Sequence, residues 1–118
     1  MPIVHIVDDD SSFRTAASRL LRAAGYDVAV YESAEQLLAR LPEITEPGCI
    51  LLDVVMPGLG GPELEERLTK LGSVLPVVLV TGNVDAGGAK KDLLTKPVAK
   101  DELIDAIERA LRGARTPQ

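Results

Sequence analysis

The sequence contains few aromatic residues, a single cysteine and no long hydrophobic segment. Aromatic side chains make up 3% of its 118 residues and tryptophan is absent, so we expect a core built from Leu, Val, Ile and Ala. One cysteine excludes an internal disulfide and suits a reducing compartment. No apolar run approaches the roughly 20 residues of a membrane-spanning helix, so we expect no membrane partner. The start, MPIVHIVDDD, lacks the basic region and apolar core of a signal peptide, which predicts a cytoplasmic protein.

The chain also lacks an excess of basic residues. It has 13 Lys and Arg against 18 Asp and Glu, which gives a net charge of -5 at pH 7. A domain that grips nucleic acid needs a clustered basic face, so we expect no direct contact with nucleic acid. The length is close to the common domain size, and we expect a single domain over residues 1–118.

Apolar runs typical of strands alternate with patterns typical of helices. The predicted strands cover residues 3–7, 27–31, 49–52, 76–80 and 93–94. Apolar residues spaced about four apart predict helices between them, over residues 12–24, from 34 to 41 before Pro42, from Pro62 through a stripe of Leu64, Leu68 and Leu71, and over 101–112. The second of these helices is expected to begin at a capping box, Ser33 to Gln36. The remaining tail, residues 113–118, is expected to be frayed.

This alternation predicts an α/β fold with a parallel sheet covered by helices on both faces. Five strands fit the flavodoxin-like, doubly wound order 2-1-3-4-5. In that order ligands bind beyond the carboxyl ends of the strands where the order reverses, between the first and third strands.

Acidic residues follow both of these strands. The run Asp8, Asp9, Asp10 comes directly after the first strand, and Asp53 follows the apolar run CILL of the third. Their side chains should therefore meet at one edge of the sheet. Clustered carboxylates repel one another unless a cation offsets their charge, and Mg²⁺ prefers oxygen ligands of this kind. The pattern predicts a magnesium site.

Two further polar residues, Thr81 and Lys96, stand at the ends of the fourth and fifth strands. A hydroxyl and an ammonium beside a metal–carboxylate site can bind a phosphoryl group, and an aspartate can act as the nucleophile that accepts it. Each residue has a plain structural explanation on its own: helix capping for the acidic run, a solvated strand end for Asp53, a surface position for Lys96. The four together, each at the carboxyl end of the appropriate strand, favour a phosphoryl site.

The segments VHIVDDDSSFR, LLDVVMPGLGGPEL, VVLVTG and LLTKPV resemble the receiver domains of two-component response regulators, most closely those of the FixJ type. The resemblance covers essentially the whole chain. It implies that Asp53 is the phosphoacceptor and that Asp8 and Asp9 form an acidic pair, with Asp9 the more direct Mg²⁺ ligand. It also implies a metal contact from the backbone carbonyl of Val55.

The same resemblance implies that Lys96 contacts the phosphate, that Thr81 is the switch hydroxyl, and that the bond from Lys96 to Pro97 is cis. The phosphoryl donor would be a phosphohistidine on a sensor histidine kinase or phosphotransfer protein. Phosphorylation of Asp53 would then shift a bistable protein-interaction surface.

Three residues are expected to lie outside this chemistry. His5 is within the first strand and points along the sheet rather than into the pocket, which favours a structural role. Cys49 begins a buried strand and is interpreted as inert packing. Asp10 is expected to cap the first helix rather than bind metal.

The sequence departs from the family in two places. Leu93 stands where family members usually have Phe or Tyr, so the usual ring switch is absent. From Thr81 to Lys96 the interval is shorter by roughly 7 residues, about two helical turns, and the segment contains three glycines. We therefore expect the family's fourth helix to be missing or reduced to an irregular connection.

Loss of that helix has an expected consequence for partners. It should uncover apolar residues on the fourth and fifth strands, such as Val78 and Leu94, and on the inner face of the last helix. An exposed apolar patch usually marks a partner site. A non-standard homodimer or a dedicated partner is predicted there.

Two alternatives remain open from the sequence. One is a degenerate receiver that keeps the pocket residues but acts as a phosphorylation-independent binding module. The other is an aspartyl-phosphate phosphohydrolase of the haloacid dehalogenase kind, which would need a second Asp where Val55 stands. We expect a signalling switch rather than a turnover enzyme.

Overall fold

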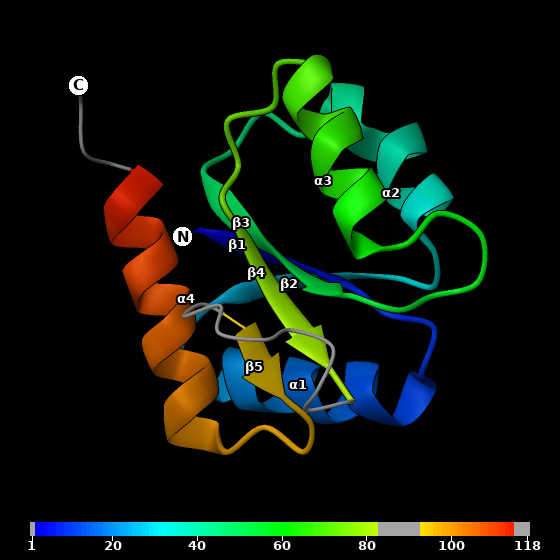
Figure 1. The fold of residues 1–118 in the computed structure, drawn as a ribbon. Helices are drawn as coiled ribbons and strands as arrows, with labels where there is room; N and C mark the ends of the chain where they lie inside the picture. The colour runs from blue at the N-terminus through cyan, green and yellow to red at the C-terminus, as the bar shows by residue number, and fades with distance from the viewer. Residues whose placement is uncertain (1, 83–92, 115–118) are drawn as a thin grey trace.

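Five parallel strands form one sheet with the order β2-β1-β3-β4-β5 (Figure 1). The computed structural model describes residues 2–82 and 93–114. The strands are β1 (Ile3–Val7), β2 (Asp27–Tyr31), β3 (Gly48–Asp53), β4 (Val77–Thr81) and β5 (Leu93–Thr95). The predicted flavodoxin-like order is confirmed. The predicted boundaries differ by at most one residue at each strand end.

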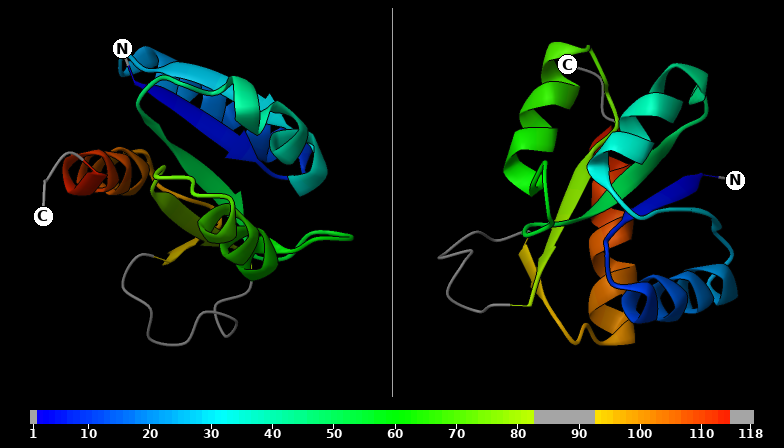
Figure 2. Two further views of the ribbon diagram at one scale, coloured as in Figure 1. Left: turned by 90° about the horizontal axis from the view of Figure 1, so that it is seen from above. Right: turned by 90° about the vertical axis from the view of Figure 1, so that its right-hand side faces the viewer.

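The helices cover both faces of the sheet. They are α1 (Ser11–Ala23), α2 (Ala34–Arg40) followed by the 3-10 turn η1 (Leu41–Glu43), α3 (Gly61–Lys70) and α4 (Lys100–Ala114). In Figure 1, α1 and α4 lie on one side of the sheet and α2 and α3 on the other. The right-hand view of Figure 2 shows α2 and α3 in front of the sheet with α4 behind it.

Two side chains that were predicted as caps begin the first two helices. Asp10 Oδ1 accepts hydrogen bonds from the backbone N–H groups of Ser12 (2.9 Å) and Phe13 (3.4 Å). Ser33 Oγ accepts one from the N–H of Gln36 at 3.2 Å. Each cap satisfies backbone donors that a helix start otherwise leaves without partners.

The core has two layers, one on each side of the sheet. Strand β3 is buried along its whole length, and its alternating side chains enter both layers because successive residues of a strand point to opposite faces. The layer under α1 and α4 includes Ile6, Leu51 and Val80, and the layer under α2 and α3 includes Ile50 and Leu52. The core is mainly aliphatic, as the composition predicts, with Tyr31 as a buried aromatic side chain in the layer under α2 and α3.

A glycine fixes how closely α3 approaches the end of β3. A Cβ atom on Gly61 would lie 2.8 Å from the backbone oxygen of Asp53 and 2.9 Å from Cα of Val54. The N–H of Gly61 donates to the backbone oxygen of Val54 at 3.0 Å. The missing side chain thus lets the start of α3 pack directly against the strand that carries Asp53.

Three sequence expectations are wrong. Leu71 was assigned to the buried stripe of α3 but is 63% exposed, because the helix ends at Lys70. Gly113 was placed in a frayed tail but belongs to α4. Val78 was expected to be uncovered but is 3% exposed, because it faces the α1–α4 layer, whereas its neighbours Val77 and Leu79 face the α2–α3 layer.

The predicted irregular connection after Gly82 falls on residues 83–92, outside the described residues, as does the side chain of Leu93. Reduction of the family's fourth helix therefore stays a prediction. Leu94 is half-buried and packs against the α1–α4 layer. Among the described helices, none has the length and apolar character needed to cross a membrane.

Candidate functional site

The carboxyl ends of four strands bring the predicted site residues to one edge of the sheet. Asp53 and Thr81 are the last residues of β3 and β4, and Asp8 and Lys96 directly follow β1 and β5. Lys96 Nζ lies 2.8 Å from Asp8 Oδ2 and 3.6 Å from Asp53 Oδ2. Residues that are far apart in the sequence therefore form one ion-pair cluster.

Three carboxylates of this cluster could hold a metal ion. One oxygen each from Asp8, Asp9 and Asp53 lies within 4.8 Å of the others. Asp8 and Asp53 are buried and Asp9 is exposed. Although Lys96 Nζ is close, Asp8 Oδ2 is a buried oxygen without a hydrogen bond of good geometry. Hard oxygen donors with one side open to water match the coordination that Mg²⁺ prefers, so these residues fit the predicted ion.

The loop after β3 places Val55 beside the cluster. The N–H of Val55 donates to Asp53 Oδ1 at 3.2 Å, and its side chain is 66% exposed. This hydrogen bond fixes one carboxylate oxygen of Asp53 and leaves the other facing Lys96. The predicted metal contact from the carbonyl of Val55 stays a prediction.

Asp53 is electrostatically unusual. Burial, and then the charge of Asp8, raise the pKa of its carboxyl from 3.8 to about 6, although the N–H of Val55 and the charge of Lys96 act in the opposite direction. Ionisation of Asp53 is therefore less favourable than that of an ordinary aspartate, although a pKa of about 6 still leaves the nucleophilic carboxylate as the main form at pH 7. A bound cation would favour that form, since opposite charge stabilises an ionised carboxyl.

Lys96 stays charged in this setting. Burial alone lowers its pKa, but the carboxylates of Asp8 and Asp53 outweigh burial and the pKa is raised overall. The backbone N–H of Lys96 donates to the backbone carbonyl oxygen of Thr81 at 2.8 Å, and the bond to Pro97 is cis as predicted. The segment that carries the ammonium is thus tied directly to the end of β4.

Thr81 is buried, with 1% of its surface exposed. It pairs with Thr95 in the register between β4 and β5, and the residue before it, Val80, is opposite Asp53. The hydroxyl-bearing residue is therefore on the strand between the phosphoacceptor candidate and the lysine segment, at the same edge.

Asp10, His5 and Cys49 make the structural contacts that were predicted for them. Asp10 caps α1, and its backbone N–H donates to Asp8 Oδ1 at 2.9 Å. His5 is buried, with Nδ1 3.0 Å from the hydroxyl of Tyr31, and burial lowers its pKa. Cys49 is fully buried, and burial raises its pKa to about 12. A thiol of that kind is inert at neutral pH.

Two residues of the first turns of α1 also reach the cluster, and sequence reasoning missed them. The ring of Phe13 lies under the ammonium of Lys96, with 4.5 Å between Nζ and the ring centroid. Arg14 Nη1 donates to the backbone oxygen of Asp8 at 2.7 Å, and Nη2 is 4.0 Å from Glu32 Oε2. The sequence did contain a signal for both residues. They follow the Asp10 cap within the first turns of α1, and that helix begins directly after the acidic residues of the site.

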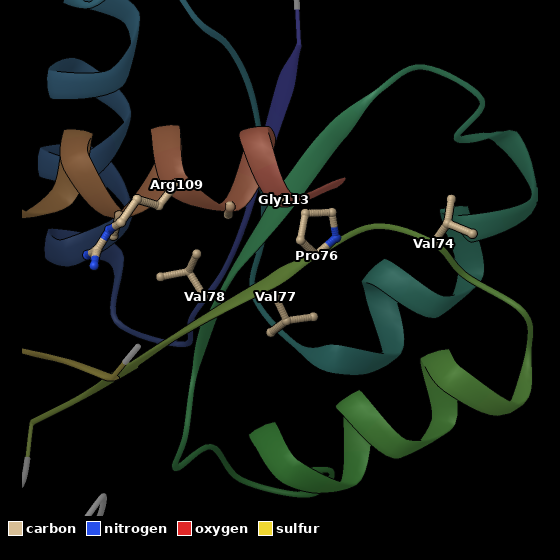
Figure 3. A pocket seen from close by; sticks show the side chains of 8 residues that line it. Val74, Pro76, Val77, Val78, Arg109 and Gly113 are labelled. Carbon is tan, nitrogen blue, oxygen red and sulfur yellow. The ribbon is translucent and has the colours of Figure 1, made fainter. Parts of the chain in front are cut away.

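A separate cavity of about 340 Å³ lies near the amino end of β4, between that strand and α4 (Figure 3). Its lining is apolar apart from Arg109, whose Nε is 3.4 Å from Asp105. None of the acidic residues or Lys96 lines it. The cavity is therefore not part of the candidate site.

Known proteins resemble this chain over nearly its full length. A family model described as a response regulator receiver domain matches residues 4–108. Nodulation protein W of Bradyrhizobium diazoefficiens is 36% identical over 122 residues, which cover 96% of this chain and 52% of that protein. The transcriptional regulatory protein FixJ of the same organism is 36% identical over 118 residues, which cover 94% of this chain and 57% of FixJ. The chain thus spans about half the length of these curated relatives.

Solved structures give the same picture. The crystal structure of FixJ-N superposes with a TM-score of 0.86 at 30% identity, covering 100% of this chain and 98% of that one. Full-length FixJ from B. japonicum gives a TM-score of 0.87 at 34% identity, covering 97% of this chain and 59% of that one.

Proposed function

Because this chain belongs to the response regulator receiver family, we propose that Asp53 accepts a phosphoryl group from a phosphohistidine. The donor would be a sensor histidine kinase or a phosphotransfer protein, the partners with which receiver domains of response regulators interact. One observation carries the assignment: the Asp53 carboxylate lies 3.6 Å from Lys96 and within 4.8 Å of carboxylate oxygens of Asp8 and Asp9. Among the described residues this is the one acidic cluster that could hold a metal ion.

The chemistry is a transfer between two side chains. A carboxylate oxygen of Asp53 attacks phosphorus, the bond from phosphorus to the histidine nitrogen breaks, and an acyl phosphate forms on Asp53. Lys96 stabilises negative charge on the transferring group, so catalysis rests on positioning and electrostatics. Asp8, Asp9, Asp53 and the carbonyl of Val55 would hold Mg²⁺, which supplies positive charge to the phosphoryl oxygens when bound.

The acyl phosphate then acts as a switch. Thr81 turns its hydroxyl towards the phosphoryl group, and the population of a second surface conformation rises. This surface would bind a protein partner, with a homodimer through β5, α4 and the segment before β5 as one form. We propose a cytoplasmic switch that makes no direct contact with nucleic acid and is not a turnover enzyme.

Phosphorylation by a small donor tests the proposal. Incubation with Mg²⁺ and acetyl phosphate, followed by intact-mass measurement, should add one phosphoryl group to the wild-type chain. Asp53→Asn should add none, and Asp27→Asn should behave as wild type because Asp27 is exposed at the opposite end of the sheet. Wild-type modification of the Asp53→Asn variant would contradict the assignment. If the wild-type chain stays unmodified, the chain is instead a binding module that works without phosphorylation.

A further inference from the structure

Within the described part of the chain, the ammonium of Lys96 lies close to two carboxylates and to one aromatic ring. Its ammonium is 2.8 Å from Asp8 and 3.6 Å from Asp53, and the third contact is the ring of Phe13, 4.5 Å away at the centroid. A cation within about 6 Å of the centre of an aromatic ring is attracted by the negative electrostatic potential over the ring face, although the ring carries no net charge. The side chain of Lys96 is 19% exposed, so water screens this attraction only in part.

The ring itself is held firmly. Phe13 is in the first turn of α1, and its N–H is bonded to the cap Asp10 at 3.4 Å. The half-buried ring also packs against the core cluster under α1 and α4, which contains Ala17 and Leu103. The backbone of Phe13 is therefore held by the helix start and its ring by the core. The ring can serve as a rigid support for the ammonium of Lys96.

We propose that Phe13 is a positioning residue, whose ring keeps the Lys96 ammonium where it meets the phosphoryl group on Asp53. This inference rests on the proposed function of Asp53. The carboxylate of Asp8, 2.8 Å from the ammonium, is also one of the proposed metal ligands, so it would have to serve two cations at once. The ring of Phe13 carries no charge and has no ligand atom for a metal ion. It can therefore contact Lys96 whether or not metal is bound, and it does not repel the incoming phosphoryl group.

A purely structural explanation is that Phe13 fills space against the core. The two explanations differ in what they require of the side chain. Packing needs an apolar group of similar size, which Leu provides. Positioning of a cation needs an aromatic face, which Tyr keeps and which ring fluorination weakens with little change in size.

Rates of phosphorylation separate the two explanations. With acetyl phosphate and Mg²⁺, Phe13→Leu should react roughly fivefold more slowly than wild type, while Phe13→Tyr should stay close to it. Phe13 is the only phenylalanine in the chain, so fluorinated phenylalanines introduced during expression alter this ring alone. The rate should fall with each added fluorine. Phe13 and Lys96 both line a cavity of about 400 Å³, and Leu20 is another residue of its wall. A control, Leu20→Val, alters this wall without touching the aromatic ring and should leave the rate unchanged.

A second measurement does not need phosphorylation. In the unmodified protein, NMR of the Lys96 ε-methylene protons should show an upfield ring-current shift in wild type and Phe13→Tyr, and an ordinary shift in Phe13→Leu. The proposal is overturned if Phe13→Leu reacts at the wild-type rate, if fluorination leaves the rate flat, or if the methylene shifts do not differ. A wild-type chain that takes no phosphoryl group would instead refute the proposed function, and the NMR comparison would still decide whether Phe13 holds Lys96.

Discussion

Replacing Asp53 by Asn should stabilise the metal-free protein. Burial and the charge of Asp8 raise the pKa of Asp53 from 3.8 to about 6, so the ionised form is less favourable in the folded chain than in the unfolded one. Asn keeps the acceptor oxygen for the N–H of Val55, which donates to Asp53 Oδ1 at 3.2 Å, but it carries no charge. The substitution therefore removes a repulsion while keeping the local hydrogen bond.

The magnitude follows from the pKa. A pKa of about 6 against 3.8 corresponds to at most about 3 kcal/mol, at 1.36 kcal/mol for each pKa unit. Because the carboxyl lies at the solvent edge of the sheet, screening reduces the expected gain in unfolding free energy to about 1–2 kcal/mol. Such a gain is a large fraction of the stability of a small domain.

The sign of the pH dependence is fixed by the same numbers. Between about pH 4 and pH 6 the folded chain binds more protons at Asp53 than the unfolded chain, so wild-type stability falls as pH rises through this range. Asp53→Asn has no such fall. The difference between the two proteins should therefore be close to zero below about pH 4 and reach its full value above about pH 6. The titration of buried His5 is common to both proteins and cancels in the comparison.

Urea denaturation in the presence of EDTA, at several pH values, measures this difference. Asp27→Asn is the matched control, since it makes the same change in net charge at an exposed position and should leave stability within about 0.5 kcal/mol of wild type. Added Mg²⁺ should stabilise wild type by mass action and Asp53→Asn much less. The reasoning is refuted if Asp53→Asn is no more stable than wild type near neutral pH, or if the difference does not vary with pH.

Four further predictions concern single residues. Asp9→Ala should weaken Mg²⁺ binding at least about tenfold by calorimetry, and unchanged affinity would remove Asp9 from the metal site. Lys96→Ala should still bind Mg²⁺ but lose most phosphorylation by acetyl phosphate, and a wild-type extent by intact mass would exclude Lys96 from the chemistry. Cys49, fully buried and with a raised pKa, should react with iodoacetamide only in denaturant, so rapid native labelling would contradict its role in packing. Gly61→Ala should destabilise the domain by about 1–3 kcal/mol in urea denaturation, because its Cβ would meet the backbone of Asp53 and Val54; wild-type stability would show that α3 can move away freely.

Much of the fold could be read from local patterns. The alternation of strands and helices, the helix caps at Asp10 and Ser33, and the carboxyl-end rule together predicted the sheet order and the edge at which Asp8, Asp53 and Lys96 meet. These features depend on residue type, on spacing and on a topological rule that holds for open parallel sheets generally. For this reason they do not require knowledge of particular contacts.

Errors arose where the outcome depends on which layer a side chain enters. Val78 was expected to be uncovered, yet it faces the α1–α4 layer and is 3% exposed. A run of consecutive apolar residues such as PVVLV has no alternation from which the face of each residue could be predicted. Leu71 continues the helical spacing of α3 but is 63% exposed, because the helix ends one residue earlier.

The sequence by itself determined the alternation of strands and helices and the set of polar residues at the carboxyl ends of the strands, because both follow from the spacing of apolar residues along the chain. Only the tertiary structure decided that the ring of Phe13 lies 4.5 Å from Lys96, that Arg14 holds the backbone of Asp8, and that Asp53 has a pKa of about 6. Such features depend on distances between side chains from different elements and on how much water reaches them. Attraction, repulsion and desolvation vary steeply with both quantities, and a linear pattern of residues contains neither.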